Sequence, residues 1–455
     1  MNEQNMSKYI KRKLPKLLIL LLLISSGIKA QNGSNYTFSL KDAIEYTYKN
    51  LSSVQNSELD KLSAQARVSE IYGLGLPQVT GSLDFNNYLS IPTSLLPGEF
   101  FGAPAGTFIP VKFGTKYNAT AGFGASQLLF NNDFLIGLKA SRTFIGLTQK
   151  NIERTRLEAA TNVAKAYYSV VINKKRIQLI DANIVRLQKT YNDLNAVYKQ
   201  GLAEQIDVDR LSVSLTNLQV ERDKVQAFIE LSTQLLKFQM GMPIADQLAL
   251  SDTLRADVVK TLETQAVSYA NRPEYSLLEY QLQLNELSAK RIRGQYLPTL
   301  VAVGALNANA QRTEFNFFNT DEKWFAISLI GLRMNWSLFD GFQRKYQLRQ
   351  ANYTIQKNQN DLVNTKNYID FQLSQANISY SNNYKTLQNV QRNLDLAQRV
   401  VSVAQKKFSA GVGTNLEVVN AEADLIEAQT NYYSSLYEII ISQIDYKRAL
   451  GSTDF

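Results

Sequence analysis

The distribution of proline constrains the fold of this chain more than any other feature. After Pro15, the prolines lie at positions 77, 92, 97, 104, 110, 243, 273 and 298, so 111–242 and 299–455 contain none. An interior proline costs a helix about 3 kcal/mol, and long stretches without proline are typical of long helices. Residues 133–198 and 343–408 contain no strong breaker. At 1.5 Å per residue, each would extend roughly 100 Å as one helix, farther than a globular domain.

Both segments carry apolar residues alternately three and four positions apart, the spacing of a coiled-coil seam. The first seam comprises Ile177, Ile180, Ile184, Leu187, Tyr191, Leu194 and Tyr198, and the second Leu387, Val390, Leu394, Ala397, Val401, Ala404 and Phe408. A second helix runs back after each seam. Its apolar residues are Leu211, Leu215, Leu218, Val225, Ile229 and Leu236 in the first case, and a looser stripe of Leu416, Val419, Ile426, Tyr433, Leu436 and Ile440 in the second. The sequence therefore predicts two long helical hairpins.

The two hairpins are copies of one unit. A constant offset of 210 residues relates the seams, aligns the turn at 201–208 with 411–418, and places Gly241 on Gly451. Such self-similarity indicates a structural repeat, with the first copy at 31–242 and the second at 243–455. The long helices are predicted at about 131–200 and 204–240, and at about 341–410 and 414–450.

Upstream of each hairpin, apolar and polar residues alternate in two segments. We predict strands at about 78–90 and 116–130 in the first copy and at about 299–311 and 324–339 in the second, with 91–114 and 313–323 as the loops between them. Alternation of this length is typical of transmembrane β-barrel strands, but a soluble sandwich would show it too. Four strands cannot close a barrel, which needs at least about eight, whereas three chains would supply twelve.

The first thirty residues form a separate block. Five basic residues, from Lys8 to Lys16, precede the apolar run at 17–24, and Ala30 offers a small residue before Gln31. This pattern predicts a secretory signal peptide at 1–30, since eight apolar residues are too few for a spanning helix of roughly 20. Six basic residues and one acidic residue leave with it, so the formal net charge falls from +9 to +4. Nucleic-acid binding then has no basic stripe to support it.

Cysteine and histidine are both absent from the chain. Their absence excludes disulfides, thiolate nucleophiles, iron–sulfur clusters, histidine metal ligands and Ser–His dyads. Acid–base chemistry would fall to carboxylates, lysines or tyrosines, but the sequence shows long amphipathic surfaces and no catalytic constellation. We therefore predict no catalytic residue, no metal-ligating residue, no cofactor and no enzymatic activity.

Short motifs in a fixed order resemble those of the TolC-type outer-membrane efflux proteins over essentially the whole length after the signal peptide. They are the opening helix at 38–44, Leu-Pro at 76–77, Ser-Gln-Leu-Leu-Phe at 126–130, Trp-Ser-Leu-Phe-Asp-Gly at 336–341, the two glycine turns and Arg-Ala-Leu-Gly at 448–451. The resemblance implies a mixed α and β homotrimer, in which a twelve-stranded transmembrane β-barrel continues into an α-helical periplasmic barrel. It also implies a passive exit duct in the outer membrane of a Gram-negative bacterium, serving efflux or type I secretion. An inner-membrane pump and a periplasmic adaptor would dock on it, and its cargo could be drugs, metal ions, metabolites or polypeptides.

The resemblance also implies functional residues. Gly201, Leu202, Gly411 and Val412 lie at the turns that meet the adaptor in the family, although a glycine there also simply ends a helix. Beyond the second turn the family typically has two acids facing the channel, three positions apart. This chain has Glu417 and Asn420, so one ring of three carboxylates would favour cations and the next would be neutral. For Glu417, a solvated helix face is the alternative.

Some family members hold the turns closed with a tyrosine and an arginine that bond to neighbouring acids. The matching positions are Phe408 and Gly413, which leaves Asp207, at the acid position of the first copy, without its usual partners. We therefore expect either that closure rests on other contacts or that the resting pore is looser, and we expect Gly413→Arg to tighten the pore. Aromatic residues near predicted strand ends, including Tyr117, Trp324 and Trp336, would form interfacial belts or pack within the protein.

Three classes without a pore remain as alternatives, one of them a hydrolytic enzyme that uses carboxylates. A periplasmic adaptor would share a long helical hairpin, but it would not show the duplication. A secreted coiled-coil scaffold would explain the heptads but not the four alternating segments.

Overall fold

The computed structural model describes residues 35–252 and 268–455, and the predicted signal peptide lies outside these ranges. The chain forms two compact units. The first comprises the described residues up to Asn56, Arg154–Asn271 and Ile369–Phe455, and the second comprises Ser57–Glu153 and Arg272–Tyr368. The units do not coincide with the predicted repeats, because each unit takes segments from both copies.

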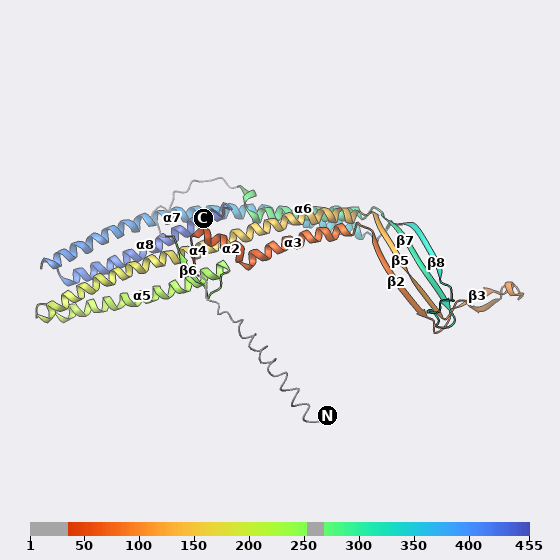
Figure 1. The fold of residues 1–455 in the computed structure, drawn as a ribbon. Coiled ribbons are helices and arrows are strands. Elements are labelled where there is room, and N and C mark those ends of the chain that lie inside the picture. The colour runs from red at the N-terminus through yellow and green to blue at the C-terminus, as the bar shows by residue number, and fades with distance from the viewer. Residues whose placement is uncertain (1–34, 253–267) are drawn as a thin grey trace, which may run out of the picture. The chain divides into compact units, whose positions relative to one another are not determined.

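Two helical hairpins supply most of the first unit, as predicted, and the first helix of each begins in the second unit (Figure 1). One consists of α4 (Asn132–Lys199) and α5 (Gln205–Met240), and the other of α7 (Gln343–Ser409) and α8 (Asn415–Ala449). The short helix α2 (Leu40–Asn50) packs in the same unit. Two strands that the sequence did not indicate, β1 (Asn35–Phe38) and β6 (Gln247–Leu250), form a parallel pair.

The core of the first unit lies where the hairpins meet α2 and the parallel strand pair. Its largest buried side chains include Tyr167, Leu236, Met240 and Ile439. The Tyr167 hydroxyl donates to Asp252 Oδ2 at 2.9 Å, and the Leu40 N–H donates to the same oxygen at 2.9 Å. Burial raises the pKa of Tyr167, so this phenol remains a hydrogen-bond donor at physiological pH. The carboxylate thus ties α4 to the start of α2.

The predicted seam of α4 is buried at every second position, at Ile180, Leu187 and Leu194. On α8 the predicted stripe is only partly right, because Leu416 is exposed. The buried positions there include Val418 and Leu425, which the sequence analysis did not select.

The second unit contains α3 (Ser52–Gly73), α6 (Pro273–Gly294) and a four-stranded antiparallel sheet in the order β2-β5-β7-β8. The strands are β2 (Gln78–Asn87), β5 (Tyr117–Phe130), β7 (Thr299–Arg312) and β8 (Phe325–Asn335). The central pairing, β5 with β7, joins the two copies over the register from Tyr117↔Arg312 to Phe130↔Leu300. Strand β8 ends four residues before the predicted limit at 339.

The predicted loop at 91–114 is wrong in one respect, because it contains a second, two-stranded sheet. Strands β3 (Thr93–Pro97) and β4 (Phe108–Lys112) pair antiparallel, with the 3-10 helix η1 (Gly98–Phe101) at their turn. Four prolines concealed this hairpin, because proline argues against a strand except at an edge. A two-stranded sheet consists only of edges. Among residues 35–252 and 268–455, none of the helices combines the length and the hydropathy needed to cross a membrane.

Candidate functional site

Both long hairpins turn at a left-handed glycine. Gly201 and Gly411 have φ of 77° and 74°. The N–H groups of Leu202 and Val412 each donate five residues back, to Val197 O at 3.2 Å and to Lys407 O at 3.0 Å. This is the Schellman ending of a helix, and a residue with a Cβ would be strained at either glycine. The predicted correspondence of the turns therefore extends to their backbone conformation.

The residue after each glycine is apolar and exposed. Leu202 is 76% exposed and Val412 74% exposed, and Ile206 and Leu416 at the starts of α5 and α8 are also exposed. Isolated apolar side chains on a surface are ordinary, but here they recur at equivalent positions of two copies. The four predicted turn residues thus form two similar apolar tips.

Glu417 and Asn420 lie one turn apart on the exposed face of α8. The Glu417 N–H donates to the N-cap hydroxyl Thr414 Oγ1 at 3.3 Å, and its carboxylate accepts an ion pair from Lys407 Nζ at 2.8 Å. An exposed pair of this kind contributes at most about 1 kcal/mol and breaks readily. Lys407 was not predicted as a site residue, and its positive charge partly neutralises the Glu417 carboxylate.

Asp207 has a partner other than the tyrosine and arginine that Phe408 and Gly413 replace. Arg210, one turn along α5, lies 3.4 Å from its carboxylate. The Asp207 backbone carbonyl also accepts from Asn415 Nδ2 at 3.2 Å. The first turn of α5 is thereby joined to the first turn of α8.

Phe408 occupies a contact between the hairpins, where it packs against the apolar clusters of both. Gly413 has no room for a side chain, since a Cβ there would lie 2.9 Å from Lys407 Cβ and 3.0 Å from Phe408 N. Gly413→Arg would therefore displace the turn rather than add a bond across it. This steric conflict argues against the expectation that the substitution tightens the pore.

A buried ion pair links the two hairpins between their turns and the core of the first unit. Arg186 on α4 contacts Glu422 on α8 through Nε and Nη2, at 2.9 and 2.7 Å from the two carboxylate oxygens. Glu422 is only 3% exposed. Gln405 of α7 donates to the same carboxylate at 2.8 Å, so three helices converge on it.

Glu422 belongs to a polar series on α8 with a period of seven residues. Asn415, Glu422 and Gln429 share one face, and each bonds to the first hairpin: to Asp207 O, to Arg186 and to Asn183. We call these three contacts the polar ladder. They alternate with Val418 and Leu425, so 415, 418, 422, 425 and 429 follow strict heptad spacing. An apolar pattern alone does not reveal this seam, because three of its five positions are polar.

The sheet of the second unit presents one apolar and one mainly polar face. By register, the apolar face carries Val79, Leu83, Phe85, Phe123, Leu306, Ile330, Leu332 and Met334. The other face carries Thr80, Ser82, Asp84, Asn118, Thr120, Asn307 and Asn309, and its apolar residues are Leu128 of β5, Val301 and Val303 of β7, and Phe325, Ile327 and Leu329 of β8. Both edge strands, β2 and β8, are exposed along nearly their whole length.

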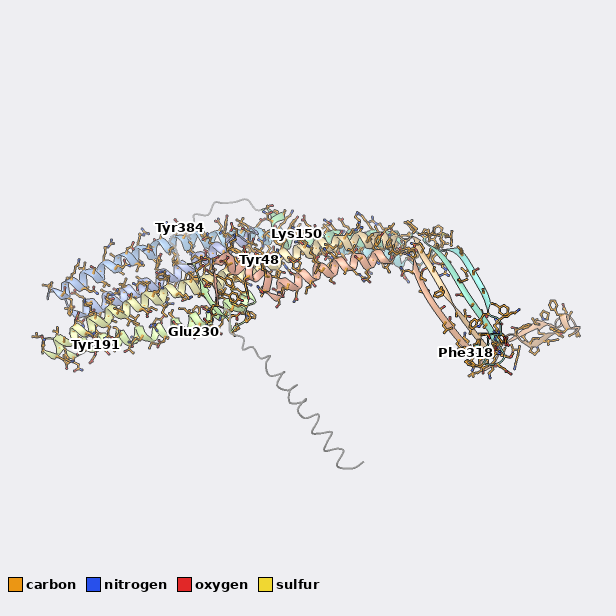
Figure 2. All side chains as sticks on the ribbon, in the orientation of Figure 1. Tyr48, Lys150, Tyr191, Glu230, Phe318 and Tyr384 are labelled. Carbon is orange, nitrogen blue, oxygen red and sulfur yellow. The ribbon has the colours of Figure 1, made fainter. Side chains whose placement is uncertain are left out.

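Aromatic side chains gather at both ends of this sheet. At the loop end, Phe85 and Tyr117 stack at 6.2 Å, and Phe315 and Phe317 each pack edge-on against Phe85 at 5.5 Å. Figure 2 shows this end with Phe318 labelled. At the helix end, Trp336 Nε1 donates to Tyr296 O at 3.0 Å. The apolar face therefore lies between two aromatic groups.

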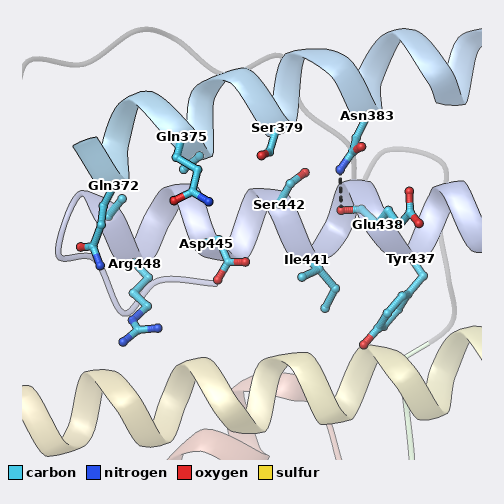
Figure 3. A pocket seen from close by; sticks show the side chains of 12 residues that line it. Gln372, Gln375, Ser379, Asn383, Tyr437, Glu438, Ile441, Ser442, Asp445 and Arg448 are labelled. Carbon is cyan, nitrogen blue, oxygen red and sulfur yellow. Dashed lines mark hydrogen bonds between the residues drawn. The ribbon is translucent and has the colours of Figure 1, made fainter. Parts of the chain in front are cut away.

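A groove of about 390 Å³ lies between α7 and α8 in the first unit (Figure 3). Asn383 Nδ2 donates across it to Glu438 O at 3.3 Å, and Asp445 pairs with Lys165 at 2.5 Å. Of the two acidic residues in the lining, Asp445 is therefore already paired with a cation. In the described part of the chain, no three acidic side chains come close enough to hold a metal ion.

Residues 267–452 match the family described as outer membrane efflux protein. The alkaline protease secretion protein AprF of Pseudomonas aeruginosa is 20% identical over 314 residues, which are 68% of this chain and 63% of that relative. The outer membrane protein TolC of Vibrio cholerae is 19% identical and covers 73% of this chain and 76% of its own. The chain thus spans less than two thirds of AprF.

Solved outer-membrane channels share the fold. A CusC structure superposes with a TM-score of 0.74 at 15% identity, covering 93% of this chain and 96% of that one. The open-state MtrE channel of Neisseria gonorrhoeae gives a TM-score of 0.72 at 14% identity, covering 91% and 89%. The predicted fold class, in which paired strands adjoin long helical hairpins, is thereby confirmed.

Proposed function

We propose, from the match of residues 267–452 to the outer membrane efflux protein family and from the fold shared with solved outer-membrane channels, that this chain is the outer-membrane exit duct of a tripartite efflux or type I secretion system. Three copies form one pore and conduct cargo passively, without a catalytic step. The observation that carries the proposal is an incomplete sheet: four antiparallel strands with one apolar face and two open edges.

The strand order supports closure by three chains. Neighbouring strands in β2-β5-β7-β8 are all antiparallel, so β2 and β8 run in opposite directions. The free edge of β8 can therefore pair antiparallel with β2 of a second copy, and a ring of such contacts leaves no edge unpaired. Three copies give twelve strands, within the range of outer-membrane barrels, whereas one copy cannot close.

The faces and ends of the sheet support a place in the membrane. In a closed barrel the apolar face meets lipid and the mainly polar face lines the lumen. The register from Thr299↔Asn335 to Asn309↔Phe325 spans about 33 Å of strand, and with the usual tilt this covers a band of roughly 25 Å. The aromatic groups at the two ends lie where interfacial belts are expected.

In this proposal the helical hairpins extend the duct into the periplasm. The tips around Gly201, Leu202, Gly411 and Val412 meet the adaptor that brings the inner-membrane pump. Glu417, repeated three times, forms a carboxylate ring at the constriction, with Asn420 as the neutral ring beyond it and Asp207 nearby on α5.

The decisive experiment is electrophoresis of outer-membrane fractions from producing cells, with and without heating. We expect a trimer-sized band that collapses to the monomer on boiling. Recovery of the protein as a soluble periplasmic monomer would overturn the proposal and favour a coiled-coil scaffold or an adaptor.

Charged residues at the tips are expected to weaken adaptor binding. Leu202→Asp combined with Val412→Asp places a hydrated carboxylate where an apolar contact forms, and should lower adaptor cross-linking by about ten-fold. Gln200→Ser, at an exposed polar position of the same turn, is the matched control. Equal cross-linking of both variants would remove the tips from the adaptor interface.

Removing the Glu417 carboxylate is expected to reduce cation preference. Glu417→Gln deletes three negative charges from the trimer and should lower the preference for cations over anions by about two-fold. Lys407→Gln frees the same carboxylate from its partner and should raise that preference by about two-fold. Reversal potentials in a KCl gradient across a planar bilayer measure this. If both variants shift the reversal potential in the same direction, or if neither shifts it, Glu417 lies away from the ion path.

A further inference from the structure

The hairpin of β3 and β4, residues 93–112, is a self-contained element at the loop end of the sheet; we call it the outer hairpin (Figure 1). Its turn is braced internally. The Gly98 N–H donates to Thr107 O at 2.7 Å, the Ala103 N–H donates to Gly98 O at 2.9 Å, and Thr107 Oγ1 donates to Pro104 O at 2.7 Å. A Cβ at position 98 would overlap Thr107 Oγ1 and lie 3.0 Å from Ala103 Cβ, so the turn favours glycine there. The outer hairpin is therefore an ordered element and holds its tip in a fixed conformation.

That ordered tip carries large exposed apolar side chains. Phe100 is 82% exposed, and Leu95, Phe101 and Phe108 are each more than half exposed. Only two of the residues 93–112 are charged, Glu99 and Lys112, so the hairpin has no net charge. A rigid, uncharged element with clustered exposed aromatics is typical of a surface that another protein covers.

The position of the outer hairpin favours a second copy of this chain as that protein. Five residues separate it from β2, the edge strand that joins β8 of the next copy in the proposed ring. The hairpin is therefore continuous with the proposed contact between copies. A phosphate-bearing lipid headgroup would need a basic cluster, and Lys112 is the only cation among residues 93–112.

The length of the outer hairpin matches the distance it would have to cover. Twelve strands about 4.8 Å apart, tilted by about 40°, enclose a barrel of roughly 12 Å backbone radius. A five-residue strand extends about 17 Å before the turn is counted. Each hairpin can therefore reach from the barrel wall to the threefold axis.

We propose that the three outer hairpins of a trimer meet over the outer mouth of the barrel and close it by packing Phe100 and Phe101 against one another. The inference rests on the proposed trimeric duct and adds a closure on the outside, separate from the hairpin turns at the periplasmic end. Cargo leaving the duct must separate the tips, and solutes outside the cell meet an apolar plug.

The absence of cysteine allows a clean cross-linking test. Phe100→Cys gives a trimer with three thiols at the proposed contact, and Phe123→Cys, on the central strand β5, gives three thiols far from it. After oxidation by copper phenanthroline or treatment with a short bismaleimide, we expect two of every three Phe100→Cys chains in a covalent dimer. Phe123→Cys should remain monomeric after boiling.

The outcome separates this inference from the proposed function. If no trimer band is present before boiling, the duct itself is wrong. If the trimer is present and Phe100→Cys reacts with neither reagent, the closure is wrong.

A second measurement does not depend on new thiols. Phe100→Ser with Phe101→Ser removes the apolar contact, and we expect single-channel conductance to rise several-fold while the heat-sensitive trimer band persists. Ser94→Ala, at an exposed strand position of the same hairpin, should leave conductance unchanged. Equal conductance of the double variant and the parent protein would overturn the closure.

Discussion

Glu422→Ala is expected to destabilise the contact between the two helical hairpins by about 3 kcal/mol, because Arg186 would keep its charge after its partner has gone. This value lies at the low end of the range for a buried pair, because the Arg186 side chain is 32% exposed and thus retains some contact with water. Hydrogen exchange of the purified trimer measures the effect. Amides in α8 around position 422 should exchange about a hundred-fold faster.

The control for this prediction is Glu427→Ala, which removes an exposed glutamate five residues farther along the same helix. Its exchange rates should match those of the parent protein. Arg186→Met combined with Glu422→Leu removes both charges and should restore most of the lost stability, because well-packed apolar residues can replace a buried pair. If the α8 amides of Glu422→Ala exchange no faster than those of Glu427→Ala, the polar ladder does not hold the hairpins together.

Leu83→Arg is expected to prevent stable assembly in the outer membrane. Leu83 lies in the middle of β2 on the apolar face and is 75% exposed in the single chain. An arginine facing lipid near the middle of the bilayer costs about 2–4 kcal/mol, and a trimer contains three of them. The yield of heat-sensitive trimer in outer-membrane fractions should fall by at least about ten-fold.

Ser82→Arg provides a control one residue away. Its side chain lies on the mainly polar face, which lines water in the proposed barrel, so trimer yield should stay close to that of the parent protein. Loss of the trimer in both variants would indicate general damage to β2. Normal assembly of Leu83→Arg would show that this face does not meet lipid.

Sequence reasoning predicted the long helices and the sheet strands because each depends on local pattern. Absence of proline and heptad spacing indicated α4 and α7 to within two residues at either end. Alternation indicated the start of β2 at Gln78 and the end of β5 at Phe130. The offset of 210 residues also predicted that Gly201 and Gly411 would share a conformation, and both are left-handed.

Features that depend on distant partners could not be predicted in the same way. Glu422 looked like any helical glutamate, and only its distance to Arg186, 236 positions earlier, makes it a buried contact. Strands β1 and β6 are four residues each, too short for alternation to be recognised. The lack of space at Gly413 arises from the path of the turn back toward Lys407, which no residue pattern records.

The β5–β7 pairing sets the order in which the chain can fold. Its partners lie roughly two hundred residues apart, and the whole first helical hairpin separates them. Helical turns form from neighbours in sequence, but this pairing must bear the entropy of closing a very long loop. Until Asn335 has been synthesised and exported, β2 and β5 exist as an unfinished half-sheet with an apolar face and open edges. We therefore expect the helices to form first and the sheet to form late, so that β2 and β5 are exposed to aggregation until β7 and β8 join them.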